Sequence, residues 1–203
     1  MKMNWNGRGG RILALCGVLA ASGVARGVWA CGAEDEDITT AQVGAWTISS
    51  SEVPGEEDAT SRRYPHFKLA HLMDNNSKTP WVFRGEGRAN AFDPSWGKRH
   101  AIALEREDAV MIDEIRIMNG YNKRPDLFKR NDRVVEVGIA IDGKKLKTAA
   151  LSDKMGWHSI SIPRQKVDAM IIEFIGVRKG SGRDNDICLS ELAFYNRGKK
   201  IKP

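Results

Sequence analysis

The amino-acid sequence predicts an all-β protein, an antiparallel sandwich or barrel, from about residue 60 onward. Several segments alternate apolar and polar residues with a period of two, as strands with one buried face do. Turn signals such as Asp142-Gly143 and Asn119-Gly120 separate these segments. The one helical candidate, residues 67–73, is too short to build a layer.

About eight short strands are expected in chain order. The clearest is residues 135–141, in which Val135 and three further aliphatic residues at every second position share one face. Residues 158–162 alternate in the same way, and residues 171–177 are largely apolar on both sides, as expected near the middle of a sandwich. The remaining candidates are residues 43–48, 100–104, 112–118, 144–151 and 187–195.

Residues 1–30 have the order of a secretory signal peptide. Two Arg residues precede an apolar run at residues 12–21, and small residues close the segment. We therefore expect an exported protein, periplasmic, in the cell envelope or secreted, whose mature chain begins at Cys31. Two fates of Cys31 stay open: soluble export, or attachment of a lipid as in a lipoprotein, which would be the protein's one link to a membrane. Trp29 is bulkier than the residues that usually precede a lipidated Cys.

Charge divides the rest of the chain. Of 32 Lys and Arg and 26 Asp and Glu, 28 and 18 lie in residues 61–203, which gives that part a net charge of +10. Residues 31–60 hold the other eight acids and no Lys or Arg. We expect an acidic leader or tether at residues 31–48, a domain at residues 49–196 and a basic tail at residues 197–203. The positive charge suits an anionic cell-surface polymer. Nucleic acid is a poor candidate, since export separates the protein from it and no motif for it is present.

The mature chain keeps two cysteines, Cys31 and Cys188, because Cys16 leaves with the signal. They could form one disulfide, or Cys188 stands alone if Cys31 is lipidated. We expect Cys188 to be a buried, inert thiol, because it lies in an alternating apolar stretch.

Motifs for catalysis are missing from the sequence. It contains no G-x-S-x-G elbow, no H-E-x-x-H helix and no phosphate-binding glycine loop, and its four histidines are scattered. We therefore expect a non-catalytic binding module rather than an enzyme. Paired carboxylates that meet only in space would escape this test.

Two segments resemble discoidin-type domains, the galactose-binding-like jelly roll that coagulation-factor type C domains share with many carbohydrate-binding modules. Residues 72–81, Leu-Met-Asp-Asn-Asn-Ser-Lys-Thr-Pro-Trp, resemble the loop with the Asp-Gly-Asn, Thr and Trp pattern. Residues 187–195 look like the last strand, with its Ser-Glu-Ile pattern. The resemblance implies an antiparallel β-sandwich jelly roll.

Further motifs resemble one branch of that fold, the translocation-type glycan-binding domain of NAD glycohydrolase. They are Asn-Gly-Tyr at residues 119–121, Asn-x-Arg-Val at residues 131–134, and the Gly, spacer, Asp-x-Cys-x-Ser-Glu ending at residues 180–191. The resemblance covers residues 49–196 and implies glycan recognition at a cell surface or in the envelope. It is to the accessory binding domain alone, so we expect no NAD cleavage.

The loop at residues 74–79 offers oxygen ligands of the kind that calcium binds. In discoidin-like carbohydrate-binding modules the corresponding positions hold a structural calcium ion (Ca2+), which the resemblance implies here for Asp74, Asn76, Thr79 and Glu191. The ion would tie the ends of the domain together and would not be catalytic. The alternative is that Asp74 and Thr79 only cap a turn, with Glu191 paired to a nearby Arg.

Sugar binding commonly combines an aromatic face that packs on the ring with charged or amide groups that bond its hydroxyls. Side chains of this chemistry occur in several of the expected loops. The candidates are Arg84, Glu86, Tyr121, Lys123, Arg130, Asn131, Arg133 and Arg183.

These candidates have structural alternatives. Tyr121, Asn131 and Arg133 would hold a loop together, with Arg133 bonded to backbone carbonyls, whereas Lys123 and Arg130 would belong to a solvated face.

Two tryptophans, Trp81 and Trp157, are expected in the core rather than at a sugar. A second hypothesis for function keeps the same fold and loops but gives them a protein partner in the envelope, as a scaffold domain would have.

Overall fold

The structure, a computed structural model, describes residues 39–50, 68–84, 101–182 and 186–203. These all lie in one of the chain's two units, Asp37–Pro203. The strands are β1 (Thr39–Val43), β2 (Trp46–Ser50), β3 (Trp81–Arg84), β4 (Ala101–Asn119), β5 (Arg133–Ile141), β6 (Lys144–Ala150), β7 (Trp157–Arg178), β8 (Asp186–Asn196) and β9 (Lys199–Lys200). Beside them the described part has a 3-10 helix, η2 (Leu69–Met73), and an α-helix, α1 (Pro125–Arg130).

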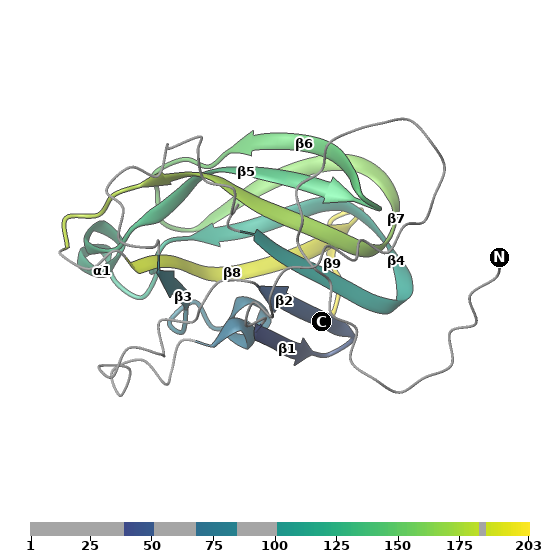
Figure 1. Ribbon diagram of the computed structural model, residues 1–203, viewed down its shortest axis with the longest axis horizontal. Helices are drawn as coiled ribbons and strands as arrows, with labels where there is room; N and C mark the ends of the chain where they lie inside the picture. The colour runs from purple at the N-terminus through teal and green to yellow at the C-terminus, as the bar shows by residue number, and fades with distance from the viewer. Residues whose placement is uncertain (1–38, 51–67, 85–100, 183–185) are drawn as a thin grey trace, which may run out of the picture. The chain divides into compact units, whose positions relative to one another are not determined.

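The strands form two layers that β4 and β7 connect (Figure 1). In one layer, residues 101–105 of β4 lie between β2 and residues 169–173 of β7. In the other layer, residues 114–118 of β4 lie between β8 and residues 157–161 of β7. Register shifts near the middle of β4 mark the bend between the layers, as bulges do. All pairings between these strands are antiparallel, so the predicted antiparallel β-sandwich is confirmed.

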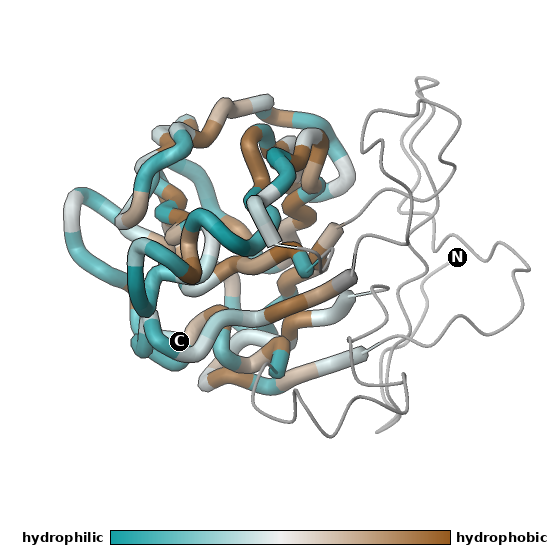
Figure 2. The backbone as a smooth tube through the Cα atoms, turned by 90° about the vertical axis from the view of Figure 1, so that its left-hand side faces the viewer, coloured by the Kyte–Doolittle hydropathy of each residue, from teal (hydrophilic) through white to brown (hydrophobic). Residues whose placement is uncertain are grey.

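The core fills the space between the layers with large apolar side chains. Trp46 packs on Phe194 with ring centroids 4.8 Å apart. Trp81 stacks on Phe83 at 4.3 Å, and Phe83 stacks on Phe174 at 5.4 Å. Trp81 is buried as expected. Figure 2 shows hydrophobic and hydrophilic positions alternating along the strands, the pattern that the sequence carried.

Two expectations about the ends of the domain need correction. Residues 43–48 are not one strand, because Gly44, with φ +59°, forms a turn that joins β1 to β2. The sheet therefore includes residues that we assigned to the acidic leader. Likewise β9 pairs with β8, so the basic tail contributes a short edge strand.

The long strands also differ from expectation. Residues 101–104 and 112–118 are parts of β4, and residues 158–162 and 171–177 are parts of β7, whereas residue 100 of the expected strand lies outside the described residues. The charged residues 105–108 lie at the bend of β4, where the alternation of buried and exposed residues stops and the register with β7 shifts between Glu105 and Val110.

Within β5 a bulge changes which residue is buried. Val134 replaces the expected Val135 in the core, since the register with β7 shifts between Val134 and Glu136. Strand β3 was not expected from the sequence. It pairs with β8 in antiparallel orientation.

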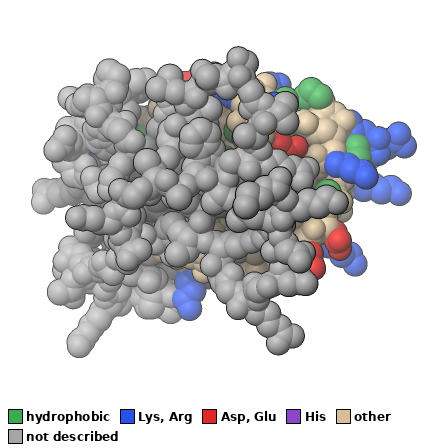
Figure 3. Space-filling model, turned by 45° about the vertical axis from the view of Figure 1, so that its right-hand side comes forward, with side chains coloured by type: hydrophobic (Ala, Val, Ile, Leu, Met, Phe, Trp, Pro, Cys, Tyr) green, Lys and Arg blue, Asp and Glu red, His purple; other side chains and the backbone are tan. Residues whose placement is uncertain are grey.

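Cys188 on β8 is buried and free, as expected, and burial raises the pKa of its thiol well above the ordinary value. Cys31 lies outside the described residues. No helix in the described ranges is long and apolar enough to cross a membrane. Where Figure 3 shows described residues, several Lys and Arg side chains gather at the surface, and Asp and Glu side chains are also visible.

Candidate functional site

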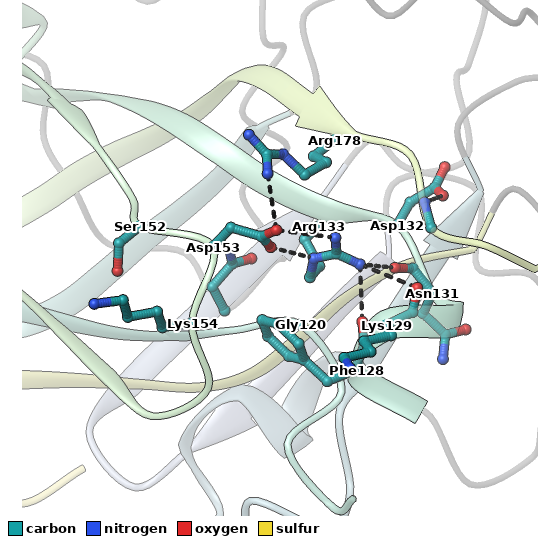
Figure 4. Close-up of polar contacts among 12 residues, drawn as sticks. Gly120, Phe128, Lys129, Asn131, Asp132, Arg133, Ser152, Asp153, Lys154 and Arg178 are labelled. Atoms are coloured by element: carbon teal, nitrogen blue, oxygen red, sulfur yellow. Dashed lines mark hydrogen bonds and ion pairs between the residues drawn. The ribbon is translucent and has the colours of Figure 1, made fainter. Parts of the chain in front are cut away.

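Three connections meet at one end of the sandwich, because β7 bends between the layers and brings both of its ends there. They are residues 120–132 between β4 and β5, residues 151–156 between β6 and β7, and residues 179–182 in the connection from β7 to β8. We call these connections, with the strand ends Arg133, Trp157 and Arg178, the loop end. Figure 4 shows the polar contacts that join the connections there.

Arg133 at the start of β5 holds this end together (Figure 4). Its side chain is 7% exposed. Its Nη1 donates to the backbone carbonyl oxygens of Phe128 and Asn131, both at 2.8 Å. Its Nε donates to Oδ1 of Asp153 at 2.6 Å, and its guanidinium carbon lies 5.0 Å from the centre of the Phe128 ring. One buried cation thus fixes the end of α1 and the β6–β7 connection.

Asp153 is shared between two cations from different strands. Beside Arg133, Nη1 of Arg178 donates to its Oδ2 at 2.9 Å. The hydrogen bond from Arg133 is the main reason that the pKa of Asp153 lies below the ordinary value. The carboxylate is therefore ionised at neutral pH and offsets the buried charge of Arg133.

Asn122 ties the β4–β5 connection to its neighbours. Its backbone N–H donates to Oγ of Ser190 at 3.0 Å, and its Oδ1 accepts the backbone N–H of Gly156 at 2.7 Å. Its Nδ2 donates to the carbonyl of Asn119 at 2.6 Å. The side chain of Asn119 in turn bonds both backbone groups of Val134. This chain of contacts fixes the residues that follow β4.

Close backbone approach explains the glycine at position 180. A Cβ there would collide with the carbonyl oxygens of Arg130 and Asn131. The N–H of Gly180 donates to Oδ1 of the buried Asp132 at 2.7 Å, and Gly182 donates to the carbonyl of Arg130 at 2.9 Å. The β7–β8 connection therefore supplies hydrogen-bond donors to the backbone carbonyl groups at the end of α1.

The sequence-predicted ligand residues divide into three groups. Arg133 and Asn131 are used structurally: Arg133 is bonded to carbonyls and Asp153, and Nδ2 of Asn131 donates to the carbonyl of Leu127 at 2.8 Å. Both side chains thus support the loop, and ligand contact by either stays a prediction. Lys123 and Arg130 are exposed, and Tyr121 is partly buried, which raises the pKa of its hydroxyl. Glu86, Arg183 and the side chain of Arg84 lie outside the described residues.

Trp157 was expected in the core, and that expectation is wrong. It opens β7 with 40% of its surface exposed, next to Met155 with 39% exposed. The alternation of side chains along the strand could have predicted this exposure. Ile160 faces the core, so Trp157, an odd number of residues earlier, faces outward. Trp157 pairs with Met118 just before the β4–β5 connection, so this exposed ring belongs to the loop end.

The Asp74 loop follows η2 at the other edge of β8. Oδ1 of Asp74 accepts the N–H of Asn76, and Oδ2 accepts the hydroxyl of Thr79, both at 2.8 Å. The N–H of Thr79 donates to the carbonyl of Asn76 at 3.0 Å. Asp74 and Thr79 thus cap a turn. Lys200 on β9 bonds Asn75 of the same loop, which brings the chain's end against it.

Glu191 on β8 faces this loop and is 2% exposed. Neither of its carboxylate oxygens makes a hydrogen bond of good geometry. Burial, with Asp74 as a further cause, raises the pKa of Glu191 from the ordinary 4.5 to about 8. A bulge puts it there, because Met118 is opposite Glu191 whereas Asn119 is opposite Leu189.

No group of three or more His, Cys, Asp or Glu side chains in the described part could hold a metal ion by itself. A cation between Asp74 and Glu191 would need hydroxyl and carbonyl oxygens as further ligands, as calcium accepts.

The model of one protein family, described as the NAD glycohydrolase translocation F5/8 type C domain, matches residues 48–195. No curated protein sequence matches the chain significantly.

Several solved structures are similar. The family 32 carbohydrate-binding module of NanJ from C. perfringens, in complex with galactose, has a TM-score of 0.50 and 14% identity over 79% of this chain and 100% of that one. The CBM32-1 and CBM32-2 domains of ZmpB from Clostridium perfringens give 0.51 and 16%, over 85% and 43%. A protein fragment from Bacteroides thetaiotaomicron gives 0.54 and 11%, over 81% and 94%.

At such low sequence identities, these structural similarities show a shared fold alone. The chain spans only 13% of a further ZmpB chain that includes an M60 catalytic domain.

Replacing Arg133 with Met should destabilise the domain by roughly 2–4 kcal/mol, because Asp153 loses its buried partner and two carbonyl groups lose their donor. Urea unfolding measures this change. Arg178→Met, which removes an exposed partner of the same carboxylate, should change stability by less than about 1 kcal/mol. Equal stability of Arg133→Met and the wild type would contradict the structural role of Arg133.

The raised pKa of Glu191 predicts a pH dependence in EDTA. Between about pH 4.5 and 8 the unfolded chain releases this proton and the folded domain keeps it. The unfolded state then binds fewer protons, so the free energy of unfolding should fall as pH rises, by up to about 1.4 kcal/mol per unit.

Urea unfolding at pH 5.5 and pH 7.5 measures this fall. Glu191→Gln, which mimics the protonated form, should show a smaller decrease than the wild type. An identical decrease in both proteins would show that Glu191 titrates normally.

Proposed function

The chain belongs to the NAD glycohydrolase translocation F5/8 type C domain family, and from this membership and the geometry of the loop end we propose that it is an exported binding module that recognises a glycan. The site is the loop end, with Trp157 as the surface on which a sugar ring packs. The ring's hydroxyls meet the polar side chains of the neighbouring connections.

The exposed ring of Trp157 carries this proposal. An aromatic side chain at a protein surface offers a flat apolar face, which matches the C–H face of a pyranose ring. Polar groups lie in the same connection, including the exposed Lys154. The combination of one apolar face and several hydrogen-bonding groups is the usual chemistry of a site for a small polar ligand.

The distribution of apolar surface favours a glycan over a protein partner. Within the described ranges, the large hydrophobic side chains that are exposed are Met155, Trp157 and Ile175. Met155 and Trp157 are separated by one residue in the sequence, whereas Ile175 lies on the part of β7 that pairs with β5. A protein interface commonly needs a broader apolar patch than these residues provide.

The galactose complex of the NanJ module is a further support, because it shows that this fold can present a sugar site. Its 14% identity carries no residue of that site to this chain. We therefore assign the glycan to the loop end on the chemistry of this chain's own side chains.

Replacing Trp157 with Ala should weaken binding to glycans on an array roughly tenfold or more and leave the fold intact, because the ring is exposed in the free protein. Ile175→Ala is the matched control, since it removes a similarly exposed apolar side chain elsewhere on the same strand. Unaltered binding by Trp157→Ala, or an equal loss in both variants, would place the site elsewhere. No binding by a folded wild type would overturn the glycan proposal for the sugars tested.

We also propose a structural calcium ion held by Asp74, Asn76, Thr79 and Glu191. The chemistry of these residues fits the ion: two carboxylates, a hydroxyl and a carbonyl are hard oxygen ligands. The buried carboxylate oxygens of Glu191 make no hydrogen bond of good geometry and lie near Asp74 and Asn76, and an ion there would satisfy them. Bound there, calcium supplies positive charge between two carboxylates and joins the loop after η2 to β8.

Calcium should raise the melting temperature of the wild type by several degrees relative to EDTA, because it binds the folded state alone. Glu191→Gln should lose this increase, since it removes a charged ligand and keeps the side chain's shape. Asp113→Asn, at a partly exposed carboxylate that accepts the N–H of Arg197, is the control and should keep the increase. A calcium-induced increase that survives in Glu191→Gln would contradict the assigned ligands.

A further inference from the structure

We propose that the glycan bound at the loop end is anionic, a polysaccharide with sulfate or carboxylate groups, and that a cluster of basic side chains there selects it. This inference rests on the proposed function and adds the chemical class of the ligand. The cluster combines side chains from all three connections. Its members are Lys123, Lys129, Arg130, Lys154, Arg178 and Lys179.

All six side chains of this loop-end basic cluster belong to exposed residues. Backbone contacts hold their connections together, since Ser181 donates to the carbonyl of Lys129 at 3.0 Å and Gly182 to that of Arg130 at 2.9 Å. Arg178 is drawn to the β6–β7 connection by Asp153. Figure 4 shows Lys129, Lys154 and Arg178 around the Arg133 network.

The acidic groups of the loop end are already occupied or buried. Asp153 is paired with Arg133 and Arg178, and Asp126 with Arg124. Asp132 is 7% exposed and Asp186 is 6% exposed. The exposed groups that remain for a ligand are therefore mainly cations.

The opposite end of the sandwich provides a comparison. In the described part, residues 120–133, 151–157, 178–182 and 186 hold eight Lys and Arg against four Asp, a net charge of +4. Residues 105–111, 141–147 and 163–169, which come together at the bends of β4 and β7, hold six against five, a net of +1.

Positive charge is thus concentrated at the end that also carries Trp157. A cationic surface raises the local concentration of an anionic ligand and speeds its association. Five of the six side chains, all except Arg178, form no ion pair with a described carboxylate. They can bond an anion without breaking a contact of the fold. The aromatic ring beside them favours a sugar polymer over an anion without an apolar face.

The test compares dextran sulfate with unsulfated dextran of the same length, by isothermal titration with the purified protein. We expect binding to the sulfated polymer that is at least tenfold tighter and weakens as salt rises, because the contacts are exposed. Polygalacturonate, as a second arm, distinguishes carboxylate from sulfate recognition. Vesicles containing phosphatidylglycerol form the third arm, and a preference for them over both polymers would overturn the proposal.

Two pairs of substitutions separate a site from general attraction. Lys129→Gln with Arg130→Gln removes two cations of the cluster, and Lys144→Gln with Lys145→Gln removes two exposed cations at the opposite end. We expect roughly three- to thirtyfold weaker binding for the first pair and less than twofold for the second. An equal loss in both would mean that net charge alone attracts the polymer, which would contradict the proposal.

A second cluster variant, Lys154→Gln with Lys179→Gln, guards against an effect on α1 and should weaken binding as the first pair does. If neutral glycans bind as tightly as anionic ones and Trp157→Ala abolishes both, the glycan function stands and the anionic preference fails. If neither kind of polymer binds and the glycan array is also empty, the proposed function itself fails.

Discussion

The buried charge of Arg133 is the constraint on which the loop end depends. A guanidinium removed from water needs a counterion and acceptors for its N–H groups. Here these are Asp153, from the β6–β7 connection, and the carbonyls of Phe128 and Asn131, from the end of α1. The charge therefore fixes two connections relative to the sheet. Through Asp153 it also positions Arg178, so the exposed side chains around it are presented by a rigid support.

The bends of β4 and β7 make this arrangement available. Each strand passes from one layer to the other, and β7 returns to the end at which it began, so that Trp157 and Arg178 belong to the same region. Bulges also direct single side chains. The one in β8 turns the buried Glu191 toward the Asp74 loop, although Leu192 beside it packs in the core. A small irregularity in pairing thus decides which acid meets which loop.

The fold class could be predicted because strand alternation is a local property of the sequence. The sequence could not predict that two expected strands join into β4, because the charged residues at the bend of β4 resemble a loop. The turn formed by Asp74 and Thr79 could be predicted, because the two residues lie close together in the sequence. The position of Glu191 beside this loop could not, because it depends on the bulge in β8. For Arg133 the sequence left ligand binding and loop support open, and only the assembled connections show the contacts by which it supports the loop. Trp157 was assigned to the core as an apolar residue, but counting from Ile160 places it outside.

The most direct test of a glycan site at the loop end is hydrogen–deuterium exchange of the protein with and without saturating dextran sulfate. A glycan site at the loop end predicts slower exchange in residues 120–131, 152–157 and 178–182, with little change at residues 141–147 and 163–169. Slower exchange confined to the opposite end, or spread evenly over both ends, would contradict it.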